Sequence, residues 1–313
     1  MAPGERPLLL LDCDPGHDDA LALALAAPHA DLLGVTTVAG NVPLERTTAN
    51  ALTMCEVLGL DVAVHAGSPR PLVAELRTAE AIHGASGLDG PAHPKHRRVA
   101  ASNDAVAFII DAVRSHPGAL TIVATGPLTN VALALRAAPD IAGLLRGVSI
   151  MGGGVPWGNA TAAAEFNVLV DPEAADVVFR SGVPLTMAGL DATHQWMIDE
   201  PIIERIRRSG GAVAAFCADL LAFYGAAYER VFSDRVAGPL HDPLAVLAVT
   251  HPALVETERL HVVIELTGTH TRGMTVADLR GVKRSAAPNV DVVRRVDVAG
   301  ATDLLVDTLA SYG

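Results

Sequence analysis

A run of leucines near the start of the chain stops abruptly at a cluster of carboxylates. Residues 8–11 are all leucine, and residues 12–19 read Asp-Cys-Asp-Pro-Gly-His-Asp-Asp. A short continuous apolar run is typical of a strand buried on both faces, and Pro15-Gly16 indicates a turn. The alanine- and leucine-rich segment 20–27 then predicts a helix, with Asp18 as its expected N-cap. The segment therefore predicts a strand, a tight turn and a helix, with carboxylates gathered at the carboxyl end of the strand.

Carboxylates at this position indicate a ligand site. Ligands of open α/β sheets bind beyond the carboxyl ends of the strands. Several like charges repel one another unless a cation or a set of hydrogen-bond donors compensates them. Carboxylate oxygens are the ligands that Ca²⁺ and Mg²⁺ prefer. The alternative is that these residues only cap the turn and the helix, which accounts for one of them more easily than for all of them together.

The rest of the chain alternates between segments that resemble strands and segments that resemble helices, which predicts an α/β fold with a mostly parallel sheet and helices on both faces. Strands are expected at 32–38, 62–64, 120–124, 148–151 and 184–190, and helices up to about residue 58 and at 103–115, 130–138, 171 onward, two within 199–240, 242–249 and 303–310. Segments at 260–267 and near 274 and 290 predict a small antiparallel extension near the C-terminus. A connection as long as 67–98 is usually either a functional lid or a disordered segment. No linker stands out, so we expect one domain over residues 1–313.

The composition excludes several classes of partner. A formal net charge of −12 is unsuited to a nucleic acid polymer. Three scattered cysteines predict neither a disulfide framework nor a thiolate zinc site, and they suit the cytoplasm. No signal peptide is expected from the N-terminal residues, and no uncharged apolar stretch approaches the roughly 20 residues that span a membrane.

Other polar clusters fall at predicted strand ends or helix starts. His241 is suited to proton transfer near neutral pH, and Asp242 beside it is an expected N-cap. Glycines 152–154 follow a predicted strand, but no Lys-Ser or Lys-Thr pair follows them, so a phosphate loop is excluded. Asn159, Glu165 and Asn167 suit the hydrogen bonding of neutral hydroxyls, which indicates a sugar.

Together these blocks resemble the inosine–uridine-preferring nucleoside hydrolases. The resemblance rests on segments 12–19, 36–41, 82–84, 125–130, 151–154, 158–161, 165–167, 241–243 and 273–278, which occur in the family's order. It implies the nucleoside hydrolase fold, an open Rossmann-like sheet. It also implies an enzyme that hydrolyses the N-glycosidic bond of a ribonucleoside to ribose and free base, and we expect it to be a homo-oligomer, either a dimer or a tetramer.

The resemblance also implies a role for each site residue. Asp14, Asp19, Asp242 and the backbone carbonyl of Thr125 would bind one Ca²⁺, with Asp12 behind them orienting the loop. Asp14 would be the general base that takes a proton from water, and His241 would protonate the departing base. The substrate-binding set would comprise Asp18, Asn41 and Asn167 on the ribose 2′ and 3′ hydroxyls, Asn159 and Glu165 on the 5′ hydroxyl, Met151 beside the sugar, and His83 and Tyr228 near the base.

Two other functions compete with this interpretation. One is an Asp-x-Asp phosphohydrolase, which needs a threonine soon after the second aspartate and a positive residue for phosphate; residues 15–18 are Pro-Gly-His-Asp instead. The other is a non-catalytic nucleoside- or sugar-binding protein, which would be expected to lack Asp14 or His241. The sequence leaves open the choice between purine and pyrimidine, because the base pocket is expected between Phe223 and Arg235, where the match is loose.

Overall fold

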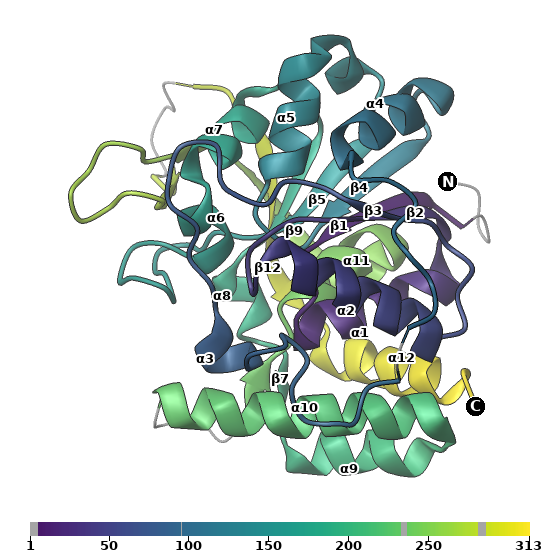
Figure 1. Cartoon of the computed structure of the whole chain (residues 1–313). Coiled ribbons are helices and arrows are strands. Elements are labelled where there is room, and N and C mark those ends of the chain that lie inside the picture. Colours follow the sequence, from purple (N-terminus) through teal and green to yellow (C-terminus); the bar gives the residue numbers. More distant parts are fainter. Residues whose placement is uncertain (1–5, 95, 233–236, 281–285) are drawn as a thin grey trace.

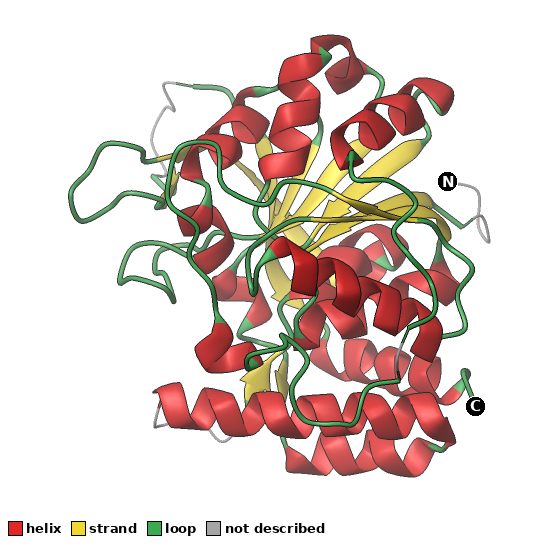
Figure 2. Cartoon of the chain, in the orientation of Figure 1, coloured by secondary structure: helices red, strands yellow, loops and turns green. Residues whose placement is uncertain are grey.

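An eight-stranded sheet forms the centre of the molecule in the computed structural model, which describes residues 6–94, 96–232, 237–280 and 286–313 (Figures 1 and 2). The strand order is β3-β2-β1-β4-β5-β6-β12-β9. The strands are β1 (Leu8–Cys13), β2 (Asp31–Thr37), β3 (Val64–Ala66), β4 (Leu120–Ala124), β5 (Gly147–Met151), β6 (Leu185–Ala188), β9 (Val255–Leu260) and β12 (Val290–Val296). Neighbouring strands are parallel except at the edge, where β9 runs antiparallel to β12. The predicted open, mostly parallel sheet is confirmed.

The strand order places a binding crevice next to β1. From β1 the chain builds outward through β2 to β3 on one side, and through β4, β5 and β6 on the other. In sheets of this kind a ligand crevice opens where the order reverses, outside the carboxyl ends of the two strands that flank the reversal. Those strands are β1 and β4, which end next to Asp14 and Thr125.

Helices cover both faces of the sheet (Figure 1). One face carries α4 (Ala105–Ser115), α5 (Thr129–Ala137) and α7 (Pro172–Arg180), and the other carries α1 (His17–His29), α2 (Leu44–Val57), α11 (Asp242–Thr250) and α12 (Val298–Ala310). Beyond α1 and α12 lie α9 (Glu200–Ser209) and α10 (Gly211–Phe232). The short helices α3 (Glu80–His83), α6 (Phe166–Val170) and α8 (Leu190–Thr193) lie in connections, and 3₁₀ turns occur at Pro139–Gly143 and Pro252–Leu254.

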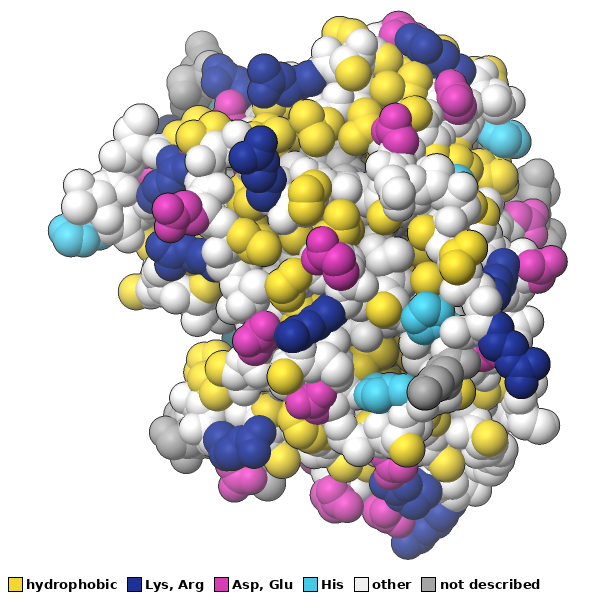
Figure 3. Space-filling model, viewed as in Figure 1, with side chains coloured by type: hydrophobic (Ala, Val, Ile, Leu, Met, Phe, Trp, Pro, Cys, Tyr) yellow, Lys and Arg dark blue, Asp and Glu magenta, His cyan; other side chains and the backbone are white. Residues whose placement is uncertain are grey.

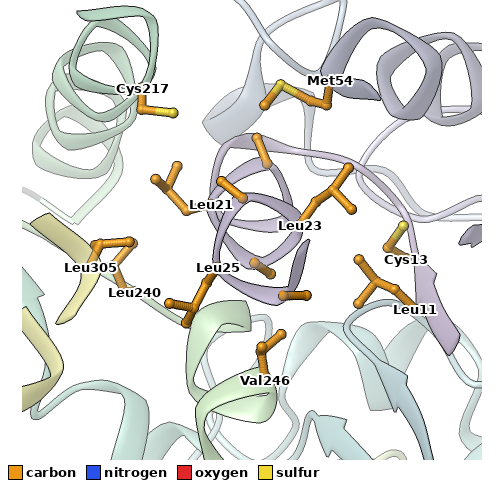
Figure 4. Close-up of a cluster of buried hydrophobic side chains, with 14 of the residues drawn as sticks. Leu11, Cys13, Leu21, Leu23, Leu25, Met54, Cys217, Leu240, Val246 and Leu305 are labelled. Atoms are coloured by element: carbon orange, nitrogen blue, oxygen red, sulfur yellow. The ribbon is translucent and has the colours of Figure 1, made fainter. Parts of the chain in front are cut away.

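Helix α1 is surrounded by other elements, which explains why its sequence is apolar all round. Its side chains Leu21, Leu23 and Leu25 leave the helix in different directions and meet residues of α2, α10 and α11 (Figure 4). All three are at most 2 % exposed. A helix packed on every side fixes the turn before it, and that turn carries the carboxylates.

The predicted helix starts need two corrections. Asp18 is not the N-cap of α1, because the helix begins at His17 and Gly16 occupies the N-cap position. Asp242 is not the N-cap of α11; it is the first helical residue, and His241 takes that position. Helix α1 begins two residues earlier than the cap preferences indicate and α11 one residue earlier, which leaves each aspartate free of the predicted N-cap role.

The remaining predicted elements are present with shifted ends. β3 lies two residues later than expected, and α12 starts at Val298 rather than 303. The expected antiparallel extension is formed by β10 (Val262–Ile264) with β11 (Thr275–Ala277) and by the edge pair of β9 with β12. The segment near residue 290 also joins the main sheet, because β12 pairs with β6. A small ribbon of β7 (Met197–Ile198) and β8 (Gly238–Pro239) completes the strands of the described residues.

Helix α10 is long and apolar enough to cross a membrane by length and composition alone. Its most apolar 18-residue window has a mean hydropathy of 1.4, and half of that window is buried inside the protein. The buried side packs against α1, α9 and α12, and Asp219 interrupts the apolar run. These contacts are those of a core helix.

Charges on the surface are mixed. On the face shown in Figure 3, acidic and basic side chains are interspersed over the helices and loops. Several form exposed ion pairs, such as Arg114 with Asp140 at 2.9 Å. Pairs of this kind contribute little to stability.

Candidate active site

The turn between β1 and α1 buries all four of its carboxylates. Asp12, Asp14, Asp18 and Asp19 are each at most 4 % exposed. The Asp19 carboxylate accepts a hydrogen bond of 2.9 Å from the backbone N–H of Gly16, at the start of the helix. The N-terminal end of a helix carries partial positive charge, so α1 offsets part of the negative charge gathered there.

Asp14 has one satisfied oxygen and one open oxygen. Its Oδ2 accepts a hydrogen bond of 2.7 Å from the backbone N–H of Asn41, whereas its buried Oδ1 has no partner among the described residues. Two glycines make room for the carboxylate: a Cβ at Gly40 would lie 2.0 Å from Oδ2, and one at Gly126 would lie 2.4 Å from Oδ1. A buried carboxylate oxygen without a donor suits a cation.

Three further carboxylates converge beside Asp14. Asp18, Asp19 and Asp242 each offer an oxygen within 4.8 Å of the others. Burial raises the pKa of the Asp18 carboxyl to about 7, and the charge of Asp19 adds to this. Burial and then the neighbouring carboxylates raise the pKa of Asp14 and Asp242 well above the usual range. Burial and mutual repulsion thus favour the neutral forms of these carboxyls, and a divalent cation could offset their negative charge instead. The closest grouping includes Asp18, which the sequence placed on the sugar rather than on the metal.

Amide and hydroxyl groups connect the carboxylates to the neighbouring strands. The Thr125 hydroxyl donates to Asp19 Oδ1 at 2.7 Å, and the Thr125 carbonyl accepts from Asn167 Nδ2 at 2.8 Å. Asn167 Nδ2 also donates to the carbonyl of Met151 at 3.1 Å. Asn41 Nδ2 donates to the Asp14 carbonyl and to Asp19 Oδ2, at 3.1 and 3.2 Å. The predicted metal and ribose ligands thus form one connected network.

Asp12 lies behind this network. Its Oδ1 accepts hydrogen bonds from the Thr36 hydroxyl at 2.6 Å and from Asn130 Nδ2 at 2.8 Å. Burial raises the pKa of its carboxyl to about 6, although these two donors act in the opposite direction. The side chain joins β1 to β2 and to α5, so it braces the turn from below.

Asn159 and Glu165 lie on the loop that follows β5. Glu165 is the N-cap of α6, and its carboxylate accepts from the backbone N–H groups of Gly153, Asn167 and Val168 at 2.8–3.1 Å. Burial raises the pKa of Glu165 to about 7, against the effect of these donors. Asn159 Oδ1 accepts from the backbone of Phe166 at 3.0 Å. Both side chains line the pocket while bonded to its backbone.

Another part of the pocket lining is formed by His241, Tyr228 and His83. His241 Nε2 lies 3.0 Å from the Tyr228 hydroxyl, and its Nδ1 lies 2.8 Å from the Thr193 hydroxyl. His83 is 6 % exposed, and burial lowers its pKa well below the usual range. Tyr224 stands next to Tyr228, with ring centroids 5.2 Å apart. This wall is aromatic and holds two imidazoles.

The structure brings the predicted substrate residues into one pocket. Its lining comprises Asp18, Asn41, Ala79, Ile82, His83, Thr125, Met151, Asn159, Ala160, Glu165, Phe166, Asn167, Tyr224, Tyr228, Phe232, His241 and Asp242. No Lys or Arg is among these lining residues, although they include three carboxylates. Such a pocket suits a neutral polar ligand attached to an aromatic group.

Several lining or supporting residues were not predicted from the sequence. Phe232 lines the pocket and follows Tyr224 and the predicted Tyr228 at four-residue spacing along α10, which indicates one shared helix face; the signal was available. Thr193 and His17 carry no comparable local signal, because their partners come from distant segments. Arg235, the far limit of the expected base pocket, lies outside the described residues.

Known proteins resemble this chain along nearly its whole length. A pyrimidine-specific ribonucleoside hydrolase RihA of Shigella flexneri is 44 % identical over 310 residues, covering 97 % of this chain and 98 % of that protein. The protein of the same name from Citrobacter koseri is 43 % identical over the same shares. Among solved structures, a purine-preferring ribonucleoside hydrolase from Gardnerella vaginalis has a TM-score of 0.91 at 34 % identity, covering 97 % of this chain and 98 % of that one. A plant nucleoside hydrolase, PpNRh1, has a TM-score of 0.89 at 32 % identity, covering 98 % and 100 %.

Fold, pocket and relatives agree on a class of protein. A sheet of this order with an acidic pocket at its switch point, shared with solved nucleoside hydrolases, defines an enzyme that hydrolyses ribonucleosides. The chain belongs to the inosine–uridine preferring nucleoside hydrolase family, whose model matches residues 9–303.

Proposed function

We propose that the protein is a Ca²⁺-dependent hydrolase of the N-glycosidic bond of pyrimidine ribonucleosides, releasing ribose and free base. The preference for pyrimidines rests on the 44 % identical relatives, which are named pyrimidine-specific. The solved purine-preferring relative is more distant, at 34 % identity. Nucleotides are expected to be poor substrates, because no Lys or Arg among the lining residues would pair with a phosphate.

The residues at the turn suit one calcium ion. Asp14, Asp19, Asp242 and the Thr125 carbonyl would hold it, and the partnerless Oδ1 of Asp14 is the observation that supports this most directly. The donors are all oxygens, which favours Ca²⁺ over Zn²⁺. When bound, such an ion lowers the pKa of a water ligand and orients the sugar.

The protein's own carboxylates and amides act on the water and the ribose. Asp14 accepts a proton from the attacking water. Asp18, Asn41 and Asn167 hold the 2′ and 3′ hydroxyls. The 5′ hydroxyl is held by Asn159 and Glu165, and Met151 packs beside the sugar. As the bond to the base breaks, positive charge develops on the ribose, and the surrounding carboxylates stabilise it.

The base leaves on the side of the imidazoles. His241 supplies a proton to the departing base, and the Tyr228 hydroxyl on its Nε2 gives that proton a path. Both hydrogen-bonding nitrogens of His241 are already paired with hydroxyls, so the ring is oriented before the substrate arrives. His83 contacts the base from α3.

The observation that carries the proposal is the convergence of four buried carboxylates, those of Asp14, Asp18, Asp19 and Asp242, two of which line a pocket with no Lys or Arg among its described lining residues. The test is a panel of uridine, cytidine, inosine, adenosine and guanosine, with free base and free sugar both quantified and bound metal measured. Uridine and cytidine are expected to be hydrolysed fastest, with calcium bound. Activity that needs phosphate and yields ribose 1-phosphate would refute hydrolysis.

The remaining expectations are also part of this proposal. The chain is proposed to act as one domain over residues 1–313, as a homo-oligomer, a dimer or a tetramer, and in the cytoplasm. Light scattering of the purified protein distinguishes monomer, dimer and tetramer, and limited proteolysis tests for a second folded unit.

A further inference from the structure

His17 lies inside the acidic turn but faces away from the carboxylates. It is the first residue of α1 and is fully buried. Its Nδ1 lies 3.1 Å from Nδ1 of His83, and its backbone N lies 3.3 Å from the same atom. Its Nε2 lies 2.8 Å from the carbonyl of Asp89. A carbonyl can only accept, so Nε2 carries a proton, and all polar edges of this imidazole are occupied by the segment 83–89.

The ring of His17 also stacks against aromatic rings of α10 and against His83. Its centroid is 5.2 Å from that of Phe223 with the planes 6° apart, and 5.8 Å from that of Tyr224. It lies 5.3 Å from the ring of His83. One side chain of α1 therefore contacts both α3 and α10, the two elements that face the base.

The partner carbonyl is itself held in place. The Asp89 carboxylate accepts from the backbone N–H groups of Ala85 and Ser86 at 3.0 and 3.1 Å, and from the Ser86 hydroxyl. Gly84 has φ = 75°, and a Cβ there would lie 2.2 Å from Asp89 Oδ2. The loop after α3 is thus closed on itself and presents a fixed acceptor to His17.

His83 keeps one polar atom for a ligand. Its Nδ1 faces His17, whereas its Nε2 has no hydrogen-bond partner among the described residues, and the ring lines the pocket. His17 is absent from the pocket lining, so it can act on a substrate only through its neighbours.

We propose that His17 is a positioning residue for base recognition: it holds His83 so that Nε2 meets the polar edge of the nucleobase. The inference rests on the proposed function, because it presumes that a ribonucleoside occupies the pocket. In this arrangement, His17 connects the turn between β1 and α1 to the residues that would contact the base, without itself touching the sugar or the base.

The test compares substrates with and without a nucleobase. His17→Phe keeps the stacked ring and removes both nitrogens, whereas His17→Asn retains a polar atom near the position of Nδ1. For His17→Phe, kcat/KM on uridine is expected to fall about tenfold, the equivalent of one lost hydrogen bond, mainly through KM. On p-nitrophenyl β-riboside, which has no nucleobase edge, the loss is expected to be much smaller. His17→Asn is expected to recover part of the loss.

A double variant shows whether the effect passes through His83. The loss in His17→Phe/His83→Ala is expected to equal that in His83→Ala alone, because the two residues act as a unit. Additive losses would overturn the proposal. So would an equal loss on both substrates, or weaker Ca²⁺ binding in His17→Phe by calorimetric titration, since either result would point to damage to the turn. If the wild-type protein hydrolysed no ribonucleoside, the proposed function would fail, whatever His17 does.

Discussion

The side of the pocket proposed to hold the sugar (the sugar side) is built from strand ends, whereas the side proposed to hold the base (the base side) is built from helices and a long connection. Asp14 and Thr125 follow β1 and β4 in the middle of the sheet. His83 lies on the four-residue helix α3, and Tyr228 lies near the end of the outer helix α10. The sugar side is thus anchored to the most buried part of the fold, and the base side to its periphery.

This difference separates two tasks. Chemistry at the ribose needs carboxylates held at fixed separations, and a central parallel sheet provides such positions. Discrimination among bases needs side chains that can differ from one relative to another. Connecting segments tolerate sequence change more readily than strands do. Changes on the sugar side should therefore affect every substrate. Changes on the base side should affect mainly those substrates whose base must be bound or protonated before it leaves.

Removal of one ribose hydroxyl should have the largest effect. Thymidine and 5-methyluridine carry the same base and differ only at the 2′ position. A site built to bind a hydroxyl rejects the substrate that lacks it by ~10⁴-fold, because buried carboxylates or amides then lose a partner. Steady-state kinetics on the pair measures this ratio. A ratio near one would show that the carboxylates do not contact the ribose.

Loss of Asp14 should strongly reduce activity on all substrates alike. We expect Asp14→Ala to lower kcat/KM by ~10³-fold or more on uridine and on p-nitrophenyl β-riboside, because it removes the proposed base and a proposed Ca²⁺ ligand together. Calcium content measured by elemental analysis should fall with it. Asp111→Asn, at an exposed position on α4, serves as the control. Retained activity on the nitrophenyl substrate would contradict the role of Asp14.

Substitution of His241 should affect uridine and p-nitrophenyl β-riboside to different extents. His241→Ala is expected to cost ~10²-fold on uridine, whose base needs a proton to depart. The cost on p-nitrophenyl β-riboside should be far smaller, since nitrophenolate leaves unprotonated. The two kcat/KM values of the variant decide the matter. An equal fractional loss would assign His241 to structure rather than to acid catalysis.

The smallest effect is expected at the Tyr228 hydroxyl. Tyr228→Phe removes the partner of His241 Nε2 and keeps the aromatic wall, so uridine hydrolysis should slow about tenfold. Tyr312→Phe is the matched control, because that hydroxyl donates to the Ala24 carbonyl at 2.7 Å, outside the pocket lining. A loss as large for Tyr312→Phe would show that the assay reports stability instead.

The clustering of the acidic residues could be predicted from sequence because they come in short local blocks. The run from Asp12 to Asp19 carries its own strand, turn and helix signals, and parallel strands bring their carboxyl ends to one edge of the sheet. The exceptions concern single positions. Asp18 and Asp242 were expected as N-caps, yet α1 begins two residues earlier and α11 one residue earlier, and cap preferences do not resolve such shifts.

The base side was harder to predict because its contacts are long-range. Thr193 meets His241 across 48 positions, and His17 meets His83 across 66. No local pattern encodes such pairs, since they depend on how α8, α3 and α10 pack on the finished sheet. The four-residue spacing of Tyr224, Tyr228 and Phe232 indicates that they share one helix face. It does not indicate which part of the protein that face contacts.

The two glycines that flank Asp14 set a condition for recognising active relatives. Gly40 and Gly126 contribute no side chain, and an added methyl group at either would displace the carboxylate. A sequence could keep every acidic residue of the turn and still lose the proposed ion through an alanine at one of these positions. Genome surveys that score only the aspartates would count such a protein as an enzyme. Glycine at positions 40 and 126 therefore belongs in the sequence signature together with the aspartates.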